Sequence, residues 1–436
     1  MNSSIEQSEI NEMTKKLERF SALVDLYNDG LADKDMFLSE LSQFEKIDWT
    51  KENIFNQLLA YNALGAAYGN LKSKNLDYTK AYFENEYVHK EISYYHNLHY
   101  VVSRVKKEQW AALYWPAFRL WCRAYLCLTN AYDHLGRFCE AQQYYNLAAL
   151  DEIIQTDVEI NQGFSYANIH AFYKEEEPWI VRRAQILMKK HAKAFDAAAP
   201  DLKASVCGWP APSFDVPLVD FERIENGAFE KWVNENYLRI NRFCDVEPMS
   251  SLSMSDNVKL PYIRAAKDRQ KLFEASYEEI KKSFVDTRKL AYTAMVGSGD
   301  ISTELLKMTY KNFYSVFDKI AVFLQAYLNL PIRVHQADFA SIWTDRKGRL
   351  REDFMANPQN LSLLALYNVK LDVYGSNSVD QSFFGIHTAK RAAAGGQKRT
   401  TGAFGGGLTR KQQSNVKLLR ENYILVMKTR QKIWPK

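Results

Sequence analysis

The chain has few cysteines, and their arrangement excludes two kinds of small scaffold. There are five in 436 residues, and no two of them form a C-x-x-C pair. An odd set without such a pair predicts neither a disulfide framework nor a zinc ribbon. The cysteines are Cys122, Cys127, Cys139, Cys207 and Cys244. We therefore expect reduced thiols and a cytoplasmic location.

Long apolar runs are also missing. No stretch approaches eighteen consecutive apolar residues, and the N-terminal sequence MNSSIEQSEINEM has neither a basic start nor an apolar core. These absences predict a protein that is neither membrane-spanning nor secreted. The glycine-rich stretch GAFGGG lacks the GK[ST] ending of a phosphate-binding loop. We expect no cofactor.

The first two hundred residues have a helical pattern throughout. Apolar residues recur three and four positions apart, whereas strand-like alternation is scarce. One unit, AYLCLTNAYDHLGRFCEAQQYYNLAALDE, has the spacing of a tetratricopeptide (TPR) repeat, with small residues opposite large ones and a glycine at the turn. Its pattern positions are Tyr125, Leu128, Tyr132, Gly136, Ala141, Tyr145 and Ala148. We predict an all-α fold whose residues 1–196 form a TPR-like helical repeat domain.

Stacked hairpins of this kind leave a concave surface. That surface could bind a protein partner, such as a peptide or a helix, or it could pack against the rest of the chain.

A change in composition separates this half from the next. Four prolines occur between Ala197 and Pro217, a spacing that long helices do not tolerate. We predict a linker with short helices over residues 197–260 and a helical bundle over residues 261–384. The segment TELLKMTYKNFYSVFDKIAVFLQAYLNL has apolar residues at alternating steps of four and three, which gives one continuous apolar face.

The last fifty residues are strongly basic. Between His387 and Lys436 there are twelve Lys and Arg residues and one acid, Glu421, which gives a local charge of +11. Because the whole chain carries +5, the first 386 residues carry 5 − 11 = −6. Residues 385–436 are thus predicted to be a basic glycine-rich segment followed by a C-terminal helix.

Three blocks of sequence are similar to a known family. They are FEKWVNENYLRINRFCDVEP, KNFYSVFDKIAVFLQAYLNL, and FASIWTDRKGRLREDF together with NLSLLALYNVKLDVYG. With the repeat half, they resemble a bacterial family that carries TPR-like helices ahead of a HEPN domain, over about residues 50 to 380. The resemblance implies a helical bundle that often forms a homodimer. It also implies metal-independent RNA cleavage in members that keep a catalytic motif of Arg, four to six residues, then His.

This sequence departs from the family at that motif. None of its eight histidines has an arginine at the required spacing on its N-terminal side. An arginine could hold the scissile phosphate and a histidine could move the proton, so both are needed. His387 and Arg391 are the catalytic candidates near the expected place, but they occur in reversed order beside three alanines. The change after Gly385 reflects either a natural replacement or a shifted reading frame, which sequencing of the locus would distinguish.

The basic segment has a second possible role. Cations interleaved with glycine are typical of flexible segments that neutralise nucleic-acid phosphates, although basic tails are often only solvated. The predicted RNA contacts are Lys390, Lys398, Arg399, Arg410 and Lys411. His96 and His99 could share a helical face, but no third ligand accompanies them, so we expect no metal site.

Two functions therefore remain open. One is a HEPN-like protein that acts on or binds RNA, in stress response or phage defence as the resemblance implies. The other is a non-enzymatic TPR-type interaction module whose helical bundle dimerises.

Overall fold

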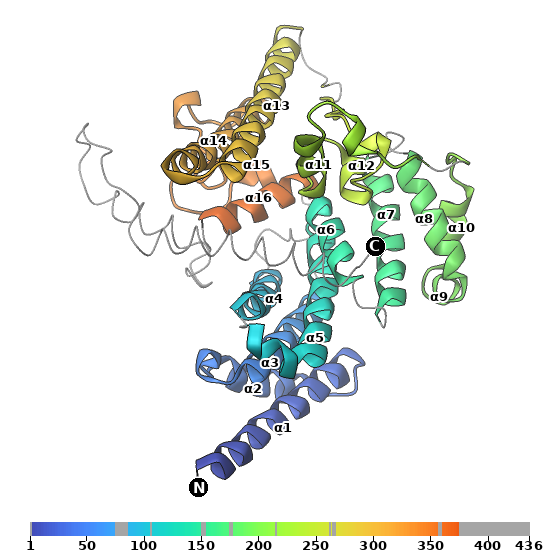
Figure 1. The fold of residues 1–436 in the computed structure, drawn as a ribbon, viewed down its shortest axis with the longest axis vertical. Coiled ribbons are helices and arrows are strands. Elements are labelled where there is room, and N and C mark those ends of the chain that lie inside the picture. The colour runs from blue at the N-terminus through green and yellow to red at the C-terminus, as the bar shows by residue number, and fades with distance from the viewer. Residues whose placement is uncertain are drawn as a thin grey trace, which may run out of the picture.

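The computed structural model is all-α, as predicted (Figure 1). It describes residues 2–74, 86–104, 107–149, 154–173, 178–213, 216–260, 263, 267–355 and 360–374. Within these ranges the only β-type pairing consists of two isolated bridges, Leu218 with Ser250 and Thr344 with Leu350. The helices thus form the whole scaffold of the described chain.

The first half contains α1 (Asn2–Asn28), α2 (Lys34–Glu45), α3 (Ile54–Lys74), α4 (Glu86–Arg104), α5 (Lys107–His134), α6 (Phe138–Ala148), α7 (Gln155–Tyr173) and α8 (Pro178–Lys190). Short helices follow: α9 (Ala192–Ala198), α10 (Pro200–Gly208), α11 (Gly227–Glu235) and α12 (Arg242–Val246). The second half contains α13 (Lys267–Val296), α14 (Gly299–Tyr327), α15 (Glu352–Met355) and α16 (Leu361–Tyr374). Within the described ranges, 3₁₀ turns lie between these helices at η1 (Trp49–Lys51), η3 (Phe221–Arg223), η4 (Ser251–Ser253) and η5 (Val334–Gln336).

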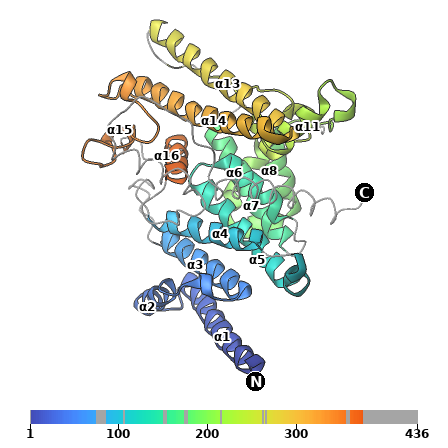
Figure 2. The same cartoon turned by 60° about the vertical axis from the view of Figure 1, so that its left-hand side comes forward.

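Consecutive helices pair as antiparallel neighbours. In the first half, α3 packs against α4, α5 against α6, and α7 against α8. In the second half, α13 and α14 form one long hairpin, which lies across the end of the molecule opposite α1 (Figure 2). Helical hairpins are therefore present in the first half, while their membership of the TPR class stays a prediction.

Small residues make room for large ones between α3 and α4. A Cβ atom on Gly65 would lie 2.7 Å from the ring of Tyr95, which is fully buried. One turn later, a Cβ on Gly69 would lie 2.8 Å from a carboxylate oxygen of Glu91. Both distances are shorter than van der Waals contact, so these two glycines set how closely the helices approach.

Glu91 forms a buried ion pair with Lys72 across the same interface. The Lys72 Nζ lies 2.7 Å from Glu91 Oε2, and both side chains are almost completely removed from solvent. Burial raises the pKa of the Glu91 carboxyl, while the neighbouring Lys72 ammonium acts in the opposite direction. The pair is stable only as a unit, because either charge alone would be buried without a partner.

Two buried clusters organise the described chain. The smaller one joins α7 and α8 to the short helices, through Tyr166, Met188, Phe195, Val206 and Phe243. The larger cluster runs through α1 to α7 and also includes residues of α14, the 339–350 segment, α15 and α16. The two halves of the molecule therefore share a core.

Helix α16 lies at the centre of this shared core. In both views it occupies the space between the α13–α14 hairpin and the helices of the first half (Figures 1 and 2). Leu363 and Leu364 are buried in the large cluster, and the ring of Tyr367 lies 5.4 Å from that of Trp343. Apolar residues lie on several faces of α16, which suits a helix that is covered from two directions.

None of the helices in the described ranges combines the length and the apolar character needed to cross a bilayer.

Replacing Lys72 by Met tests the buried ion pair. We expect the Lys72→Met variant to lose about 3–5 kcal/mol of unfolding free energy, because Glu91 would remain buried and unpaired. The double variant Lys72→Met, Glu91→Leu should recover most of this loss. Urea denaturation followed by circular dichroism measures both changes. A single variant as stable as the wild type would contradict the assignment.

Candidate functional site

Two groups of residues predicted from sequence fall in different parts of the chain. The catalytic candidates His387 and Arg391 lie outside the described residues, and so do the predicted RNA contacts Lys390, Lys398, Arg399, Arg410 and Lys411. The repeat positions lie in the hairpin of α5 and α6, where Tyr125, Leu128, Tyr132, Ala141, Tyr145 and Ala148 are all buried.

Gly136 forms the turn of that hairpin, and the structure gives two reasons for a glycine there. Its φ is +73°, in the left-handed region that side chains disfavour. A Cβ atom would also lie 2.6 Å from the carbonyl oxygen of Leu361, the first residue of α16. The turn of this hairpin thus packs directly against α16, in the second half of the chain.

Beside this turn, a polar junction of four residues connects the hairpin to α16. Arg137 donates from Nη1 to the Oδ1 of Asn368 at 2.5 Å and from Nε to Glu140 at 3.0 Å. The Asn368 Nδ2 lies 3.4 Å from Nδ1 of His89 on α4. Arg137 and Asn368 are both buried, and 231 positions separate them in sequence. We call Arg137, Glu140, Asn368 and His89 the α16 junction.

An aromatic row continues from the α16 junction into the first half. The Arg137 guanidinium stacks 4.3 Å from the ring centre of Tyr132, whose hydroxyl is 2.6 Å from Nε2 of His96. His99 stacks on Tyr125 at 3.9 Å, and burial lowers the pKa of its imidazole well below the usual value. His99 is therefore a neutral packing residue. In the described part of the chain, no three His, Cys, Asp or Glu side chains gather as metal ligands.

The α16 junction brings an arginine and a histidine to one place, but its geometry is that of a structural contact. The Arg137 guanidinium is engaged by Glu140 and Asn368 and is covered by Tyr132. To hold a phosphate from solution, it would have to break a charge-assisted ion pair in a buried setting, which is strongly unfavourable. We therefore assign the junction to the positioning of α16.

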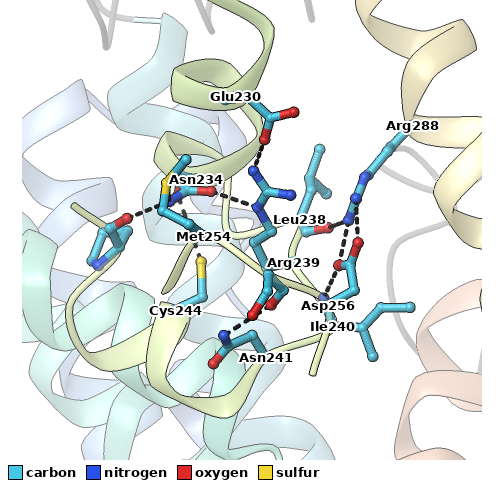
Figure 3. A network of polar contacts seen from close by, with 12 residues as sticks. Glu230, Asn234, Leu238, Arg239, Ile240, Asn241, Cys244, Met254, Asp256 and Arg288 are labelled. Carbon is cyan, nitrogen blue, oxygen red and sulfur yellow. Dashed lines mark hydrogen bonds and ion pairs between the residues drawn. The ribbon is translucent and has the colours of Figure 1, made fainter. Parts of the chain in front are cut away.

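A second polar network joins the C-terminal part of α13 to the segment that precedes this helix (Figure 3). Arg288 of α13 binds both carboxylate oxygens of Asp256, at 2.7 and 2.5 Å, and its Nη1 also donates to the Leu238 carbonyl at 2.7 Å. Asp256 accepts a further hydrogen bond from the backbone N–H of Ile240 at 2.8 Å. Because Arg288 is buried, this fork, its two-point contact with Asp256, also has a structural role: it positions segments of the chain.

Arg239 makes the other branch of this network. Its Nε donates to Oδ1 of Asn234 at 2.7 Å, and its guanidinium pairs with Glu230 on α11. Asn234 in turn donates to the Pro248 carbonyl at 2.7 Å. The two branches tie α11 and the irregular segment after it to α13 (Figure 3).

The comparison with known families identifies this second half. Residues 244–394 match the family model described as LA2681-like HEPN. This part of the chain is a HEPN-superfamily domain. The match begins in α12, contains α13 to α16, and continues to Ala394, so it includes His387 and Arg391. No curated protein and no solved structure matches the chain.

The HEPN domain therefore meets the first half through α16, while Arg288 lies inside it and Asp256 near its beginning. Sequence reasoning missed the α16 junction. The available signal was Asn368, a polar residue between apolar neighbours in LSLLALYNVKLDVY. A buried amide needs partners, but the sequence does not say which residues supply them.

Replacing Asp256 by Asn tests the Arg288 fork through its pH dependence. Burial raises the pKa of Asp256, but hydrogen bonds from Arg288 and Ile240 outweigh it and the net shift is downward. A carboxyl whose folded pKa is lowered contributes stability above its unfolded pKa, about 3.9, and loses it as the pH falls through the folded pKa. We expect Asp256→Asn to lower Tm clearly at pH 7, and by progressively less as the pH falls from about 4 through the folded pKa.

Asp286→Asn is the control, because Asp286 is an exposed aspartate on α13, the helix that carries Arg288. Its Tm should differ little from that of the wild type at either pH. Thermal unfolding at several pH values measures these differences. A Tm difference for Asp256→Asn that is constant with pH would contradict a stabilising carboxylate.

Proposed function

We propose that this protein binds RNA through its HEPN domain and the basic segment that follows α16. The family match supports the proposal, since a HEPN domain points to nucleotide- or RNA-related function. The sequence adds a local charge of +11 between His387 and Lys436. Cations at this density bind nucleic-acid phosphates by releasing counterions, whatever the base sequence. A role in stress response or phage defence belongs to the same proposal.

Cleavage is not part of this proposal. The sequence lacks the family's motif of Arg, four to six residues, then His. In the described chain, Arg137 and His89 each contact Asn368 at the α16 junction, where Arg137 is also engaged by Glu140. Binding without cutting is the function that these observations favour.

The basic segment provides the test of RNA binding. We expect the full chain to bind labelled tRNA at about 50 mM salt and to lose most of this affinity near 200 mM. The variant Lys398→Ala, Arg399→Ala, Arg410→Ala, Lys411→Ala should bind several-fold more weakly. Fluorescence anisotropy measures the affinities. Failure of the wild type to bind tRNA or total RNA at low salt would overturn the proposal.

Denaturing gels of the same mixtures test for cleavage. We expect intact RNA with the wild type and with the variant His387→Ala, Arg391→Ala. Cutting by the wild type that disappears in this variant would instead identify the reversed pair as catalytic.

We also propose that the HEPN domain self-associates, as the alternative function of a dimerising interaction module requires. Apolar side chains are exposed where α13 turns into α14: Val296 is 65% exposed, Ile301 76% and Met308 52%. Ile301 and Met308 lie seven residues apart and so share one face of α14. Exposed apolar side chains that gather on one face are typical of protein interfaces.

Charge placed on this face should prevent self-association. We expect the variant Ile301→Glu, Met308→Glu to be monomeric at concentrations where the wild type is dimeric, because carboxylates would be buried at the interface. The control Leu31→Glu changes an equally exposed leucine between α1 and α2 and should stay dimeric. Sedimentation velocity measures the oligomeric state of each protein. A monomeric wild type would contradict the proposal.

A further inference from the structure

A rigid basic turn protrudes from the HEPN domain between Thr344 and Leu350. These two residues form an isolated antiparallel bridge, and the sequence between them is Asp-Arg-Lys-Gly-Arg. All four residues from Arg346 to Arg349 are exposed, whereas Trp343 just before the turn is fully buried. The turn therefore presents its cations to solvent from a fixed base.

Asp345 holds the turn in one conformation. Its Oδ1 accepts hydrogen bonds from the backbone N–H groups of Lys347 at 2.8 Å and Arg349 at 3.0 Å. Its Oδ2 accepts from the Arg349 side chain at 2.8 and 3.0 Å, which lowers the pKa of the Asp345 carboxyl. Gly348, with φ of +77°, takes the left-handed position that the turn requires. A turn ordered in advance loses little entropy when it binds.

The base of the turn is anchored in the shared core. The Trp343 Nε1 donates to the Phe339 carbonyl at 2.9 Å, and its ring contacts those of Phe354 and Tyr367. Since Tyr367 belongs to α16, the turn emerges beside the last described helix. In sequence, the basic segment at 385–436 follows ten residues after the end of α16.

Only some of the cations in and beside the turn have a polar partner. Arg349 neutralises Asp345 in a two-point contact, and Arg351 donates from Nε to the Ile342 carbonyl. Arg346 and Lys347 have no carboxylate partner among the described residues. Glu352 and Asp353 follow in α15, so the excess positive charge is confined to the tip.

Some other cations of the HEPN domain are paired. Lys307 pairs with Glu304 at 2.5 Å and Lys319 with Glu279 at 2.8 Å, as expected of an ordinary solvated surface. The two cations at the tip differ from these in having no such partner among the described residues, and they lie next to each other on an ordered backbone.

We propose that Arg346 and Lys347 contact two phosphates of a bound RNA strand. This inference rests on the proposed RNA binding and adds a site to it, on the described surface of the HEPN domain. Arginine can bind a phosphate through its planar fork and lysine as a point charge, so neither contact depends on the base sequence.

The test compares two pairs of adjacent exposed cations in the full chain. The variant Arg346→Ala, Lys347→Ala removes the tip charges. The control variant Lys15→Ala, Lys16→Ala removes two exposed lysines from α1, at the other end of the molecule (Figure 1). The probe is a fluorescein-labelled single-stranded RNA, titrated by anisotropy at several salt concentrations.

We expect the tip variant to bind several-fold more weakly at low salt. Its slope of log affinity against log salt should fall by about 1.4, because each phosphate contact in a single strand contributes about 0.7. The control variant should keep the wild-type slope. The swap Arg346→Lys, Lys347→Arg preserves both charges and should bind nearly as well as the wild type.

The outcomes separate the two proposals. A wild-type protein that fails to bind RNA overturns RNA binding and the site with it. A wild type that binds, beside a tip variant with unchanged affinity and slope, overturns the turn alone. Equal losses in the tip and α1 variants would also overturn it, because the effect would then reflect net charge rather than a site. Unchanged circular dichroism spectra confirm that each variant is folded.

Discussion

The packing of α16 on two sides is the constraint on which the rest of the structure depends. Most of its residues are apolar and lie on more than one face, so the helix is buried by both the HEPN hairpin and the first half of the chain. Leu361 meets the repeat turn at Gly136, while Tyr367 meets Trp343 in the HEPN domain. Separation of the halves would expose one of these faces to water. The hydrophobic effect therefore holds the two halves together.

Polar contacts make this attachment specific. Apolar packing alone tolerates rotation of a helix about its axis, whereas a buried amide must meet its partners in one orientation. In α16 this buried amide is that of Asn368, whose partners are Arg137 and His89. Arg288 does the same for α13, through Asp256 and the Leu238 carbonyl. In both cases a buried arginine is used for positioning.

The buried arginines and the exposed cations of this molecule have different roles. Arg137 and Arg288 are buried, the side chain of Arg239 is 5% exposed, and all three are paired, so their charges are not available to a ligand. The cations of the turn at Arg346 and Lys347 are exposed and lie on a backbone that Asp345 orders. The basic segment and the ordered basic turn would complement each other, because the segment adds charge for phosphates while the turn offers cations in a fixed arrangement.

The sequence by itself determined the helical class, the pairing of helices around Gly136, and the HEPN resemblance of the second half. These features depend on local periodicity and on nearby residues, which a linear pattern records. The segment 197–260 was harder to interpret. Its prolines predicted short helices, but only the fold shows that Val206 and Phe243 are buried against α7 and α8.

Tertiary structure alone decided the α16 junction and the availability of the cations. Arg137 and Asn368 are 231 positions apart, and nothing in the spacing of either residue indicates the other. Likewise, Arg346 and Arg349 are both exposed, and only the conformation of the turn shows that Asp345 pairs with Arg349 and not with Arg346. Periodicity records which face of a helix is buried, whereas the partner of a buried charge depends on how distant segments meet.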